Sequence, residues 1–194
     1  IMARHLITGV AGFVGSHLAE KLLERDNEVW GVDSLVCGFR GNISELQYNQ
    51  NFHFVEQDIR EVSRFAFAPG SIDYVWHLAA RGEVYWCRDN PEEAVDININ
   101  GTLNILEIAK TAQCKHFFFA DTSAEYDSFD EEQHYPTAEW MAPNTITPMG
   151  YYPITKMAAS QFVRSFGKKH DFGTTLFRYT NIYGPSMNLE RDIP

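Results

Sequence analysis

The sequence GVAGFVG at residues 9–15 contains three glycines, each separated from the next by two residues. It directly follows a short apolar stretch at residues 5–8, which is typical of a buried strand. Gly9 permits a tight turn, Gly12 lets another group approach the backbone, and Gly15 allows a helix to pack closely on the strand. The stretch therefore predicts a strand that turns into the N-terminus of a helix. Such a terminus attracts phosphate groups, although the same glycines also suit an ordinary turn.

Strand and helix patterns alternate along the rest of the chain. Further strands are expected at residues 28–33, 52–55, 72–78, 116–120 and 174–179. Helices are expected from Val14, after Pro91 and from Tyr152, and the polar residues 127–149 are expected to form an irregular surface loop. This β-α-β order predicts an α/β fold, a doubly wound parallel sheet covered by helices on both faces, over residues 1–194 as one domain.

Two acidic positions follow the second and third expected strands. Asp33 ends the second strand, 18 residues after Gly15. A carboxylate there accepts hydrogen bonds from an adenosine ribose and repels a 2′-phosphate, so it favours NAD over NADP. A solvated loop aspartate is the alternative. Asp58 and Ile59 follow the third strand, where an adenine could rest, but that pair alone is weak evidence.

The sequence YPITK at residues 152–156 places a tyrosine and a lysine four residues apart. On a helix, Tyr152 and Lys156 therefore lie on one face and can point at one reacting centre. A free tyrosine has a pKa of about 10, which is too high for a base at neutral pH. A nearby ammonium lowers such a pKa by roughly 1–3 units. The spacing therefore predicts a tyrosine that acts as a base.

Small and hydroxyl-bearing residues end the fourth and fifth expected strands. The sequence HLAA at residues 77–80 would let the backbone pass close to a cofactor, and His77 is interpreted as a packing histidine. Thr122 and Ser123 bring a hydroxyl to the carboxyl edge of the sheet, where folds of this kind bind ligands. A simple strand-end turn is the alternative unless Tyr152 lies opposite them.

Composition excludes several other classes of protein. The formal charge of −10 argues against a general nucleic-acid binder, and no apolar run is long enough to cross a membrane. The three cysteines, Cys37, Cys87 and Cys114, have no metal-binding spacing, and the seven histidines have none either. Free thiols in a reducing cytoplasm and no metal site are therefore expected.

The order of these motifs resembles the extended short-chain dehydrogenase/reductase family, in its nucleotide-sugar epimerase/dehydratase branch. The resemblance covers essentially all 194 residues. The matching pieces are GVAGFVGSHL (9–18), VD (32–33), DIR (58–60), HLAA (77–80), NINGTL (98–103), TSAEY (122–126), YPITK (152–156) and RYTNIYGP (178–185). The resemblance implies a Rossmann-type NAD-binding domain and a smaller substrate domain beyond residue 194, largely missing from this chain.

The resemblance also implies roles for individual residues. Tyr152 would be the catalytic acid and base, Lys156 would hold the nicotinamide ribose, and Thr122 would hydrogen-bond the sugar oxygen. Asn181 would contact the phosphates of the substrate. The residues implied to bind NAD are Gly9, Gly12, Phe13, Val14, Gly15, Asp33, Asp58, Ile59, Leu78, Ala79, Ala80, Asn98, Tyr152 and Lys156.

The reaction that the resemblance implies is epimerisation of a nucleotide-linked sugar at C4, through a 4-keto intermediate and without net consumption of NAD. Family dehydratases carry an Asp-Glu dipeptide directly after the catalytic threonine, where this chain has Ser123 and Ala124. A one-residue shift would instead make Ser123 the catalytic hydroxyl and Glu125 a retained glutamate. Dehydratase or decarboxylase activity on the same scaffold, or a non-catalytic NAD-binding member, are the alternatives.

A homodimer is expected, because family members pair the helix after Pro91 with the helix from Tyr152. Four apolar residues are expected to supply exposed surface for this contact. They are Ile105, Ala109, Phe162 and Phe166.

Overall fold

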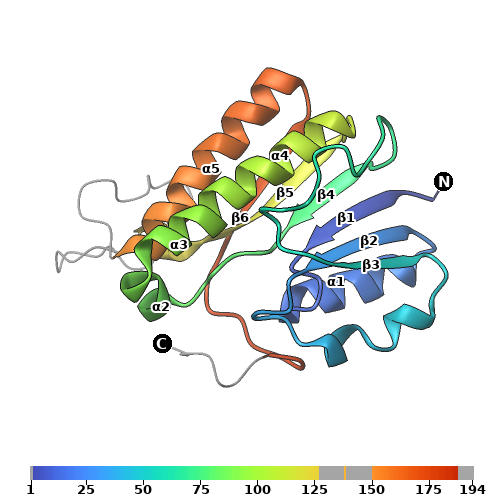
Figure 1. The fold of residues 1–194 in the computed structure, drawn as a ribbon, viewed down its shortest axis with the longest axis horizontal. Coiled ribbons are helices and arrows are strands. Elements are labelled where there is room, and N and C mark those ends of the chain that lie inside the picture. Colours follow the sequence, from blue (N-terminus) through green and yellow to red (C-terminus); the bar gives the residue numbers. More distant parts are fainter. Residues whose placement is uncertain (1, 127–137, 139–149, 188–194) are drawn as a thin grey trace.

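The computed structural model describes residues 2–126, 138 and 150–187. The loop expected at 127–149 therefore lies outside the described residues, apart from Ala138. Within them, six parallel strands form one sheet in the order β3-β2-β1-β4-β5-β6 (Figure 1). The strands are β1 (Arg4–Thr8), β2 (Glu28–Asp33), β3 (Phe52–Glu56), β4 (Tyr74–His77), β5 (His116–Thr122) and β6 (Gly173–Tyr179). The doubly wound parallel sheet is confirmed.

The strand order reverses between β1 and β4, which are neighbours in the sheet. From β1 the chain moves outward to β2 and β3, and it then crosses back to β4 and continues to β5 and β6. The loops that follow β1 and β4 therefore diverge, and they leave a crevice at the carboxyl edge of the sheet. This crevice is where a ligand site is expected in such a fold.

Helices cover both faces of the sheet (Figure 1). The helix α1 packs on β1 and β2, whereas α4 packs on β4 and α5 packs on β5 and β6. A π-helical segment, Asp96–Gly101, joins α3 to α4. The helices are α1 (Phe13–Leu23), α2 (Val84–Asp89), α3 (Pro91–Val95), α4 (Thr102–Thr111) and α5 (Tyr151–His170). Short 3-10 turns span Arg40–Ile43, Leu46–Tyr48 and Ser123–Tyr126.

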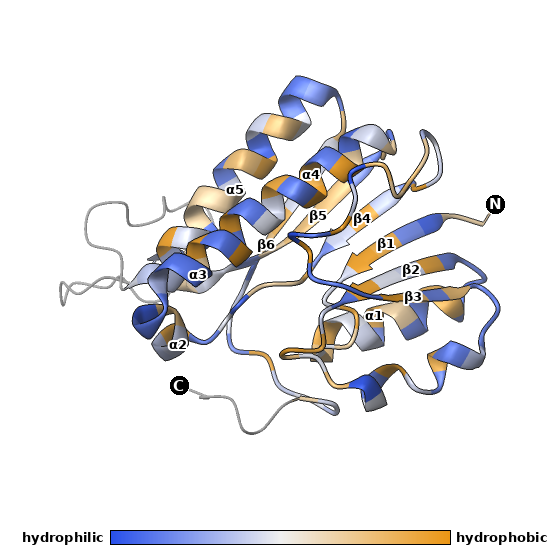
Figure 2. Ribbon diagram, in the orientation of Figure 1, coloured by the Kyte–Doolittle hydropathy of each residue, from blue (hydrophilic) through white to orange (hydrophobic). Residues whose placement is uncertain are grey.

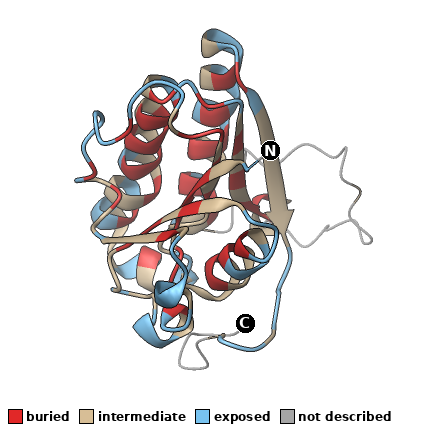
Figure 3. Ribbon diagram, turned by 90° about the vertical axis from the view of Figure 1, so that its right-hand side faces the viewer, coloured by how far each residue is buried: buried red, intermediate tan, exposed pale blue. Residues whose placement is uncertain are grey.

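The sheet separates two hydrophobic cores, because successive residues of a strand point to opposite faces. In β1, Leu6 enters the core beneath α4 and α5, and Ile7 enters the core beneath α1. Both side chains are fully buried. Figure 2 shows hydrophobic and hydrophilic residues alternating along α4 and α5, and Figure 3 shows the buried residues gathered on the strands and the inward helix faces.

One expectation about the surface is wrong. Ile105 and Ala109 are fully buried in the core beneath α4 and α5, so they do not form exposed dimer surface. Phe166 also packs against this core, whereas Phe162 is exposed as expected.

The turn between β1 and α1 leaves no room for a side chain at Gly15. A Cβ there would lie 2.8 Å from Val10 Cα and closer still to the Gly9 carbonyl oxygen. Since both neighbours are backbone atoms, we expect Gly15→Ala to lower the free energy of unfolding by about 1–3 kcal/mol. Urea unfolding measures this. Gly82 has open space around it, so Gly82→Ala should stay within about 0.5 kcal/mol of wild type. Equal stability of both variants would contradict the close packing.

Candidate active site

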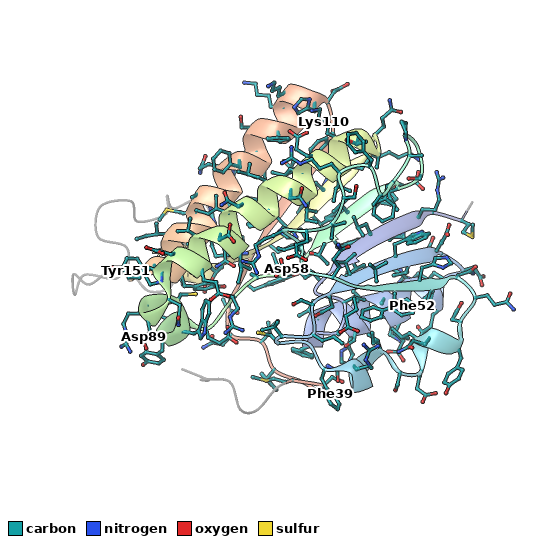
Figure 4. The ribbon with its side chains drawn as sticks, viewed as in Figure 1. Phe39, Phe52, Asp58, Asp89, Lys110 and Tyr151 are labelled. Atoms are coloured by element: carbon teal, nitrogen blue, oxygen red, sulfur yellow. The ribbon has the colours of Figure 1, made fainter. Side chains whose placement is uncertain are left out.

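A cavity of about 960 Å³ occupies the crevice at the carboxyl edge of β1 to β4. Asp58 and Phe39, which both line it, are labelled in Figure 4. Eleven of the residues that the sequence assigns to NAD line this cavity. They are Gly9, Gly12, Phe13, Val14, Gly15, Asp33, Asp58, Ile59, Leu78, Ala79 and Ala80. The motifs after four different strands thus meet at one place.

The floor of the cavity is bare backbone. Gly9 has a φ of +72°, and a Cβ on it would lie 2.8 Å from Ala79 N. Gly12 precedes the first residue of α1, and no side chain among the described residues caps this helix. The first N–H groups of α1 are therefore available to an anion. A glycine cradle that leads to an uncapped helix N-terminus fits the pyrophosphate of a dinucleotide.

Asp33 lies in the wall of the cavity and is almost fully buried. Its Oδ2 accepts a hydrogen bond from Ala11 N at 2.9 Å, and its Oδ1 accepts one from Leu35 N at 2.8 Å. The carboxylate therefore braces the glycine-rich turn from the end of β2. A carboxylate in the cavity wall beside the glycine-rich turn suits the ribose of a dinucleotide.

Arg60 is a cavity residue that the sequence analysis did not assign to the site. Its guanidinium donates to both carboxylate oxygens of Asp58 and, at 2.7 Å, to Asp96 Oδ2. The side-chain hydrogen bond from Arg60 holds the pKa of Asp58 below its usual range. The ion pairs tie the loop after β3 to the π-helical segment. The only signal in the sequence was the position of Arg60 directly after the Asp58–Ile59 pair.

The end of β5 meets the start of α5 and brings three predicted catalytic residues together. The Thr122 side chain lies close enough to Tyr152 to lower its pKa, and the Thr122 hydroxyl accepts a hydrogen bond from Ala124 N at 3.2 Å. Lys156 follows Tyr152 by one helical turn and is buried, with Nζ 4.1 Å from the centroid of the Phe119 ring. This trio lies beside the cavity and does not line it.

The expected lowering of the Tyr152 pKa by Lys156 is wrong for this structure. Burial raises the pKa of Tyr152 to about 12, although the hydrogen bond from Thr122 opposes the rise. Burial also lowers the pKa of Lys156 to about 8. The charge of Lys156 acts on the carboxyls of Asp121 and Glu125, and Asp121 raises the Tyr152 pKa further. These surroundings favour the neutral phenol form of Tyr152.

Glu125 does not reach the open side of the site. Its side chain is fully buried, and its Oε2 accepts a hydrogen bond from Arg178 Nε at 3.2 Å. The alternative register, with Ser123 as the hydroxyl and Glu125 facing a sugar, does not match this geometry. Thr122 is the hydroxyl that contacts Tyr152.

Asn98 connects the cavity to α5. Its Nδ2 donates to the Arg81 carbonyl and to Thr155 Oγ1, both at 3.0 Å, and its Oδ1 accepts from Arg81 N at 2.8 Å. Arg81 lines the cavity and Thr155 precedes Lys156. Asn98 is thus buried behind the cavity wall. Asn181 is exposed after the end of β6 and does not line the cavity.

His77 is a fully hydrogen-bonded core histidine, as the sequence analysis expected. Ala79 N donates to Thr8 Oγ1, which is 2.7 Å from His77 Nδ1. His77 Nε2 lies 2.9 Å from Thr102 Oγ1, which donates to the Asn98 carbonyl. Because Thr102 donates to Asn98, His77 Nε2 must carry a proton, and the lowered pKa of His77 leaves Nδ1 as an acceptor of the Thr8 hydroxyl. The chain of bonds fixes the cavity floor at Ala79 to the helix that carries Asn98.

The family model described as "NAD dependent epimerase/dehydratase family" matches residues 5–194. The chain belongs to this family. The match accords with the cavity, the glycine cradle and the Thr122–Tyr152–Lys156 group. The family is NAD-dependent by its description, and the cavity described above fits that cofactor.

Proteins with similar sequences include epimerases and decarboxylases. The UDP-glucuronate 4-epimerase of Thermodesulfobacterium geofontis is 34% identical over 99% of this chain and 60% of its own length. The UDP-glucuronic acid decarboxylase 5 of Arabidopsis thaliana is 29% identical over 96% of this chain and 53% of its own length. The chain thus spans little more than half the length of these relatives.

Solved structures show the same fold. The UDP-glucose 4-epimerase of Thermotoga maritima, solved with UDP-glucose, superposes with a TM-score of 0.84 at 32% identity, over 95% of this chain and 58% of that one. The UDP-glucuronic acid 4-epimerase of Bacillus cereus, solved with UDP-glucuronic acid and NAD, gives 0.82 at 29% identity, over 96% and 59%.

The described residues contain neither a metal-binding cluster nor a membrane-spanning helix. No group of three or more His, Cys, Asp or Glu side chains in residues 2–126, 138 and 150–187 is arranged to hold a metal ion. None of the helices in that part of the chain is both long and apolar enough to span a membrane.

The His77 network predicts a specific acid sensitivity. Burial, with help from the Lys156 charge, lowers the pKa of His77 to about 3, so the unfolded chain binds more protons between pH 6.5 and pH 3. The contribution of neutral His77 to stability is therefore lost as the pH falls through that window. We expect the difference in unfolding free energy between wild type and His77→Gln to shrink from pH 7 to pH 4. Urea unfolding at each pH measures it, and parallel curves would contradict the assignment.

Proposed function

We propose that this chain carries the NAD-binding and proton-transfer part of an enzyme that epimerises a nucleotide-linked sugar at C4. One observation carries the proposal. The side chains of Thr122 and Tyr152 lie next to each other at the carboxyl edge of the sheet, beside a cavity that fits a dinucleotide. A sugar hydroxyl placed against this pair would meet a proton acceptor next to the cofactor.

In this proposal Tyr152 takes the proton of the sugar 4-hydroxyl and later returns it. Thr122 donates a hydrogen bond that favours the ionised form of Tyr152. Lys156, buried one turn along α5, holds the nicotinamide ribose, and Asn181 contacts the phosphates of the substrate, as the family resemblance implies. When bound, NAD supplies the hydride acceptor and a cationic ring. Tyr152 needs that cation because its own surroundings raise its pKa.

Epimerisation is favoured over loss of water or carbon dioxide because the Asp-Glu dipeptide that follows the catalytic threonine of the dehydratases has no counterpart here. Ser123 and Ala124 carry no carboxylate, and Glu125 is fully buried against Arg178. Epimerisation needs no second acid, since one tyrosine serves both directions of proton transfer. Decarboxylation is the second candidate function, because some of the relatives are decarboxylases by name.

The substrate class comes from the relatives. Several of them act on UDP-glucuronate or UDP-glucose by name, so a UDP-linked hexose or hexuronate is the proposed substrate. A substrate domain C-terminal to the cofactor domain, which would complete the sugar pocket, is part of the proposal. A cytoplasmic location is proposed as well, supported by three free cysteines.

Product mass tests the reaction class. Full-length protein is incubated with NAD and with UDP-glucuronic acid, UDP-glucose, and dTDP- and GDP-linked hexoses. We expect one of them to yield a product of unchanged mass that separates from the substrate by chromatography. A product lighter by one water or one carbon dioxide would assign dehydration or decarboxylation instead.

Tyr152→Phe is the matched variant, because it removes one hydroxyl and keeps the ring. It should lower turnover roughly 10²–10⁴-fold and leave NAD affinity nearly unchanged. An unchanged rate would exclude Tyr152 as the acid–base group. NAD binding by wild type without turnover of any sugar would instead favour a non-catalytic member of the family.

We also propose a homodimer, formed by α3 and α5 of two copies. Four large apolar side chains are exposed on these helices, at 41–47% of their surface: Val95, Tyr151, Ile154 and Phe162. A hollow lined by residues that include Val95, Tyr151 and Ile154 lies between α3 and α5. Exposed apolar surface of this kind is typical of an interface.

A charge on this surface should separate the subunits. We expect Phe162→Glu to shift full-length protein from dimer to monomer at micromolar concentration, measured by light scattering. Phe65 is exposed at 85% on another part of the chain, so Phe65→Glu is the control and should remain dimeric. A wild-type protein that is monomeric at that concentration would refute the dimer.

A further inference from the structure

Four ionisable side chains meet beneath the reacting hydroxyls. Asp121 lies on β5 immediately before Thr122, and Glu125 lies on the 3-10 turn after it. Lys156 approaches from α5 and Arg178 from β6. The two carboxyls and Lys156 are each at most 3% exposed. In the proposed function Lys156 holds the nicotinamide ribose, whereas neither carboxyl has a role.

The two carboxyls are close neighbours, and each has one buried oxygen without a hydrogen-bond partner among the described residues. Asp121 Oδ1 accepts from Thr122 N at 3.1 Å, and Glu125 Oε2 accepts from Arg178 Nε at 3.2 Å. In the described part of the chain, the other two oxygens, Asp121 Oδ2 and Glu125 Oε1, meet no donor. The two side chains nevertheless lie close enough for each carboxyl to affect the pKa of the other.

Two ionised carboxylates in this position would repel each other in a buried site and leave two oxygens unsatisfied. A single proton between them removes both costs, because the protonated group donates to the ionised one. We propose that Asp121 and Glu125 share one proton between Oδ2 and Oε1, and that they are positioning residues which keep the Lys156 ammonium charged. We call these two residues the acid pair.

The groups that face the acid pair account for the charge balance. Lys156 and Tyr152 face it from α5 and Arg178 faces it from β6, while Tyr126 contacts Arg178 from the turn that carries Glu125. With one shared proton the acid pair carries one negative charge beside two cations. Loss of that proton adds a second negative charge and makes the cluster neutral, with Lys156 still an ammonium.

The directions of the pKa shifts agree with this arrangement. Burial raises the pKa of Glu125 to about 8, and the negative charge of Asp121 contributes to the rise. Burial lowers the pKa of Lys156 to about 8. The second negative charge of the acid pair therefore appears in the pH range where buried Lys156 would otherwise lose its proton. The acid pair thus keeps Lys156 cationic to a higher pH than burial alone would allow.

Infrared spectroscopy tests the shared proton. A protonated carboxyl has a C=O stretch well separated from the bands of ionised carboxylates. We expect wild type to show this band at neutral pH and to lose it as the pH rises past about 8. Glu125→Gln and Asp121→Asn, which keep the shape and hydrogen-bonding range, should each lack the band at neutral pH. Glu107→Gln, which changes a surface ion pair with Lys110, should keep it.

The wild-type spectrum decides the question even if a variant does not fold. Absence of a protonated carboxyl at neutral pH would overturn the proposal. Persistence of the band in either Glu125→Gln or Asp121→Asn would show that one carboxyl holds the proton without its partner, and would overturn it too.

The titration of Lys156 tests the positioning role, which rests on the proposed function of that lysine. Lysine labelled with ¹³C at Cε reports its own pKa by NMR, and Lys156→Arg assigns the signal. We expect Glu125→Gln to lower the Lys156 pKa by about 1 unit or more, since the second negative charge can no longer appear. An unchanged pKa would overturn the positioning role. Neither measurement needs NAD or turnover, so failure here and failure of the proposed reaction are distinguishable.

Discussion

The close approach of the β1–α1 turn to the end of β4 is the contact on which the rest of the site depends. A side chain on Gly9 would collide with Ala79 N, so the two loops can meet only as bare backbone. The same contact holds Ala79 where its N–H reaches Thr8, and from Thr8 the hydrogen bonds continue through His77 to Thr102. The cavity floor and the helix behind it are therefore fixed together.

This connection matters because the cofactor cavity and the reacting hydroxyls are built by different parts of the chain. The cavity belongs to the loops after β1 to β4, whereas Thr122 and Tyr152 belong to β5 and α5. Asn98 joins them, since its side chain bonds both the Arg81 backbone and Thr155. A displacement of α5 would therefore move the cavity wall at Arg81. A ligand that holds the cavity wall in place would in turn restrain the part of α5 that carries Tyr152.

The sequence predicted the sheet and most of the cavity because both follow from local rules. Strands and glycine turns have short-range signatures, and the carboxyl ends of parallel strands necessarily share an edge. The electrostatics were not predictable in the same way. The spacing of Tyr152 and Lys156 was read correctly as one helical face, but the sign of the Tyr152 pKa shift depends on burial and on Asp121. Asp96, which pairs with Arg60, and Arg178, which pairs with Glu125, likewise lie far away in the sequence, so neither contact can be predicted from the residues around it.

The π-helical segment between α3 and α4 accounts for the burial of two apolar residues of α4 that the sequence analysis expects on the surface. A π turn contains one residue more than an α turn, and each residue of an α-helix advances the chain by about 100° around the axis. Asp96–Gly101 therefore rotates everything after it, so that Ile105 and Ala109 point into the core. The segment acts as an angular spacer. It lets one continuous helical rod present Asn98 to the cavity wall at one end and a packed apolar face to the sheet at the other.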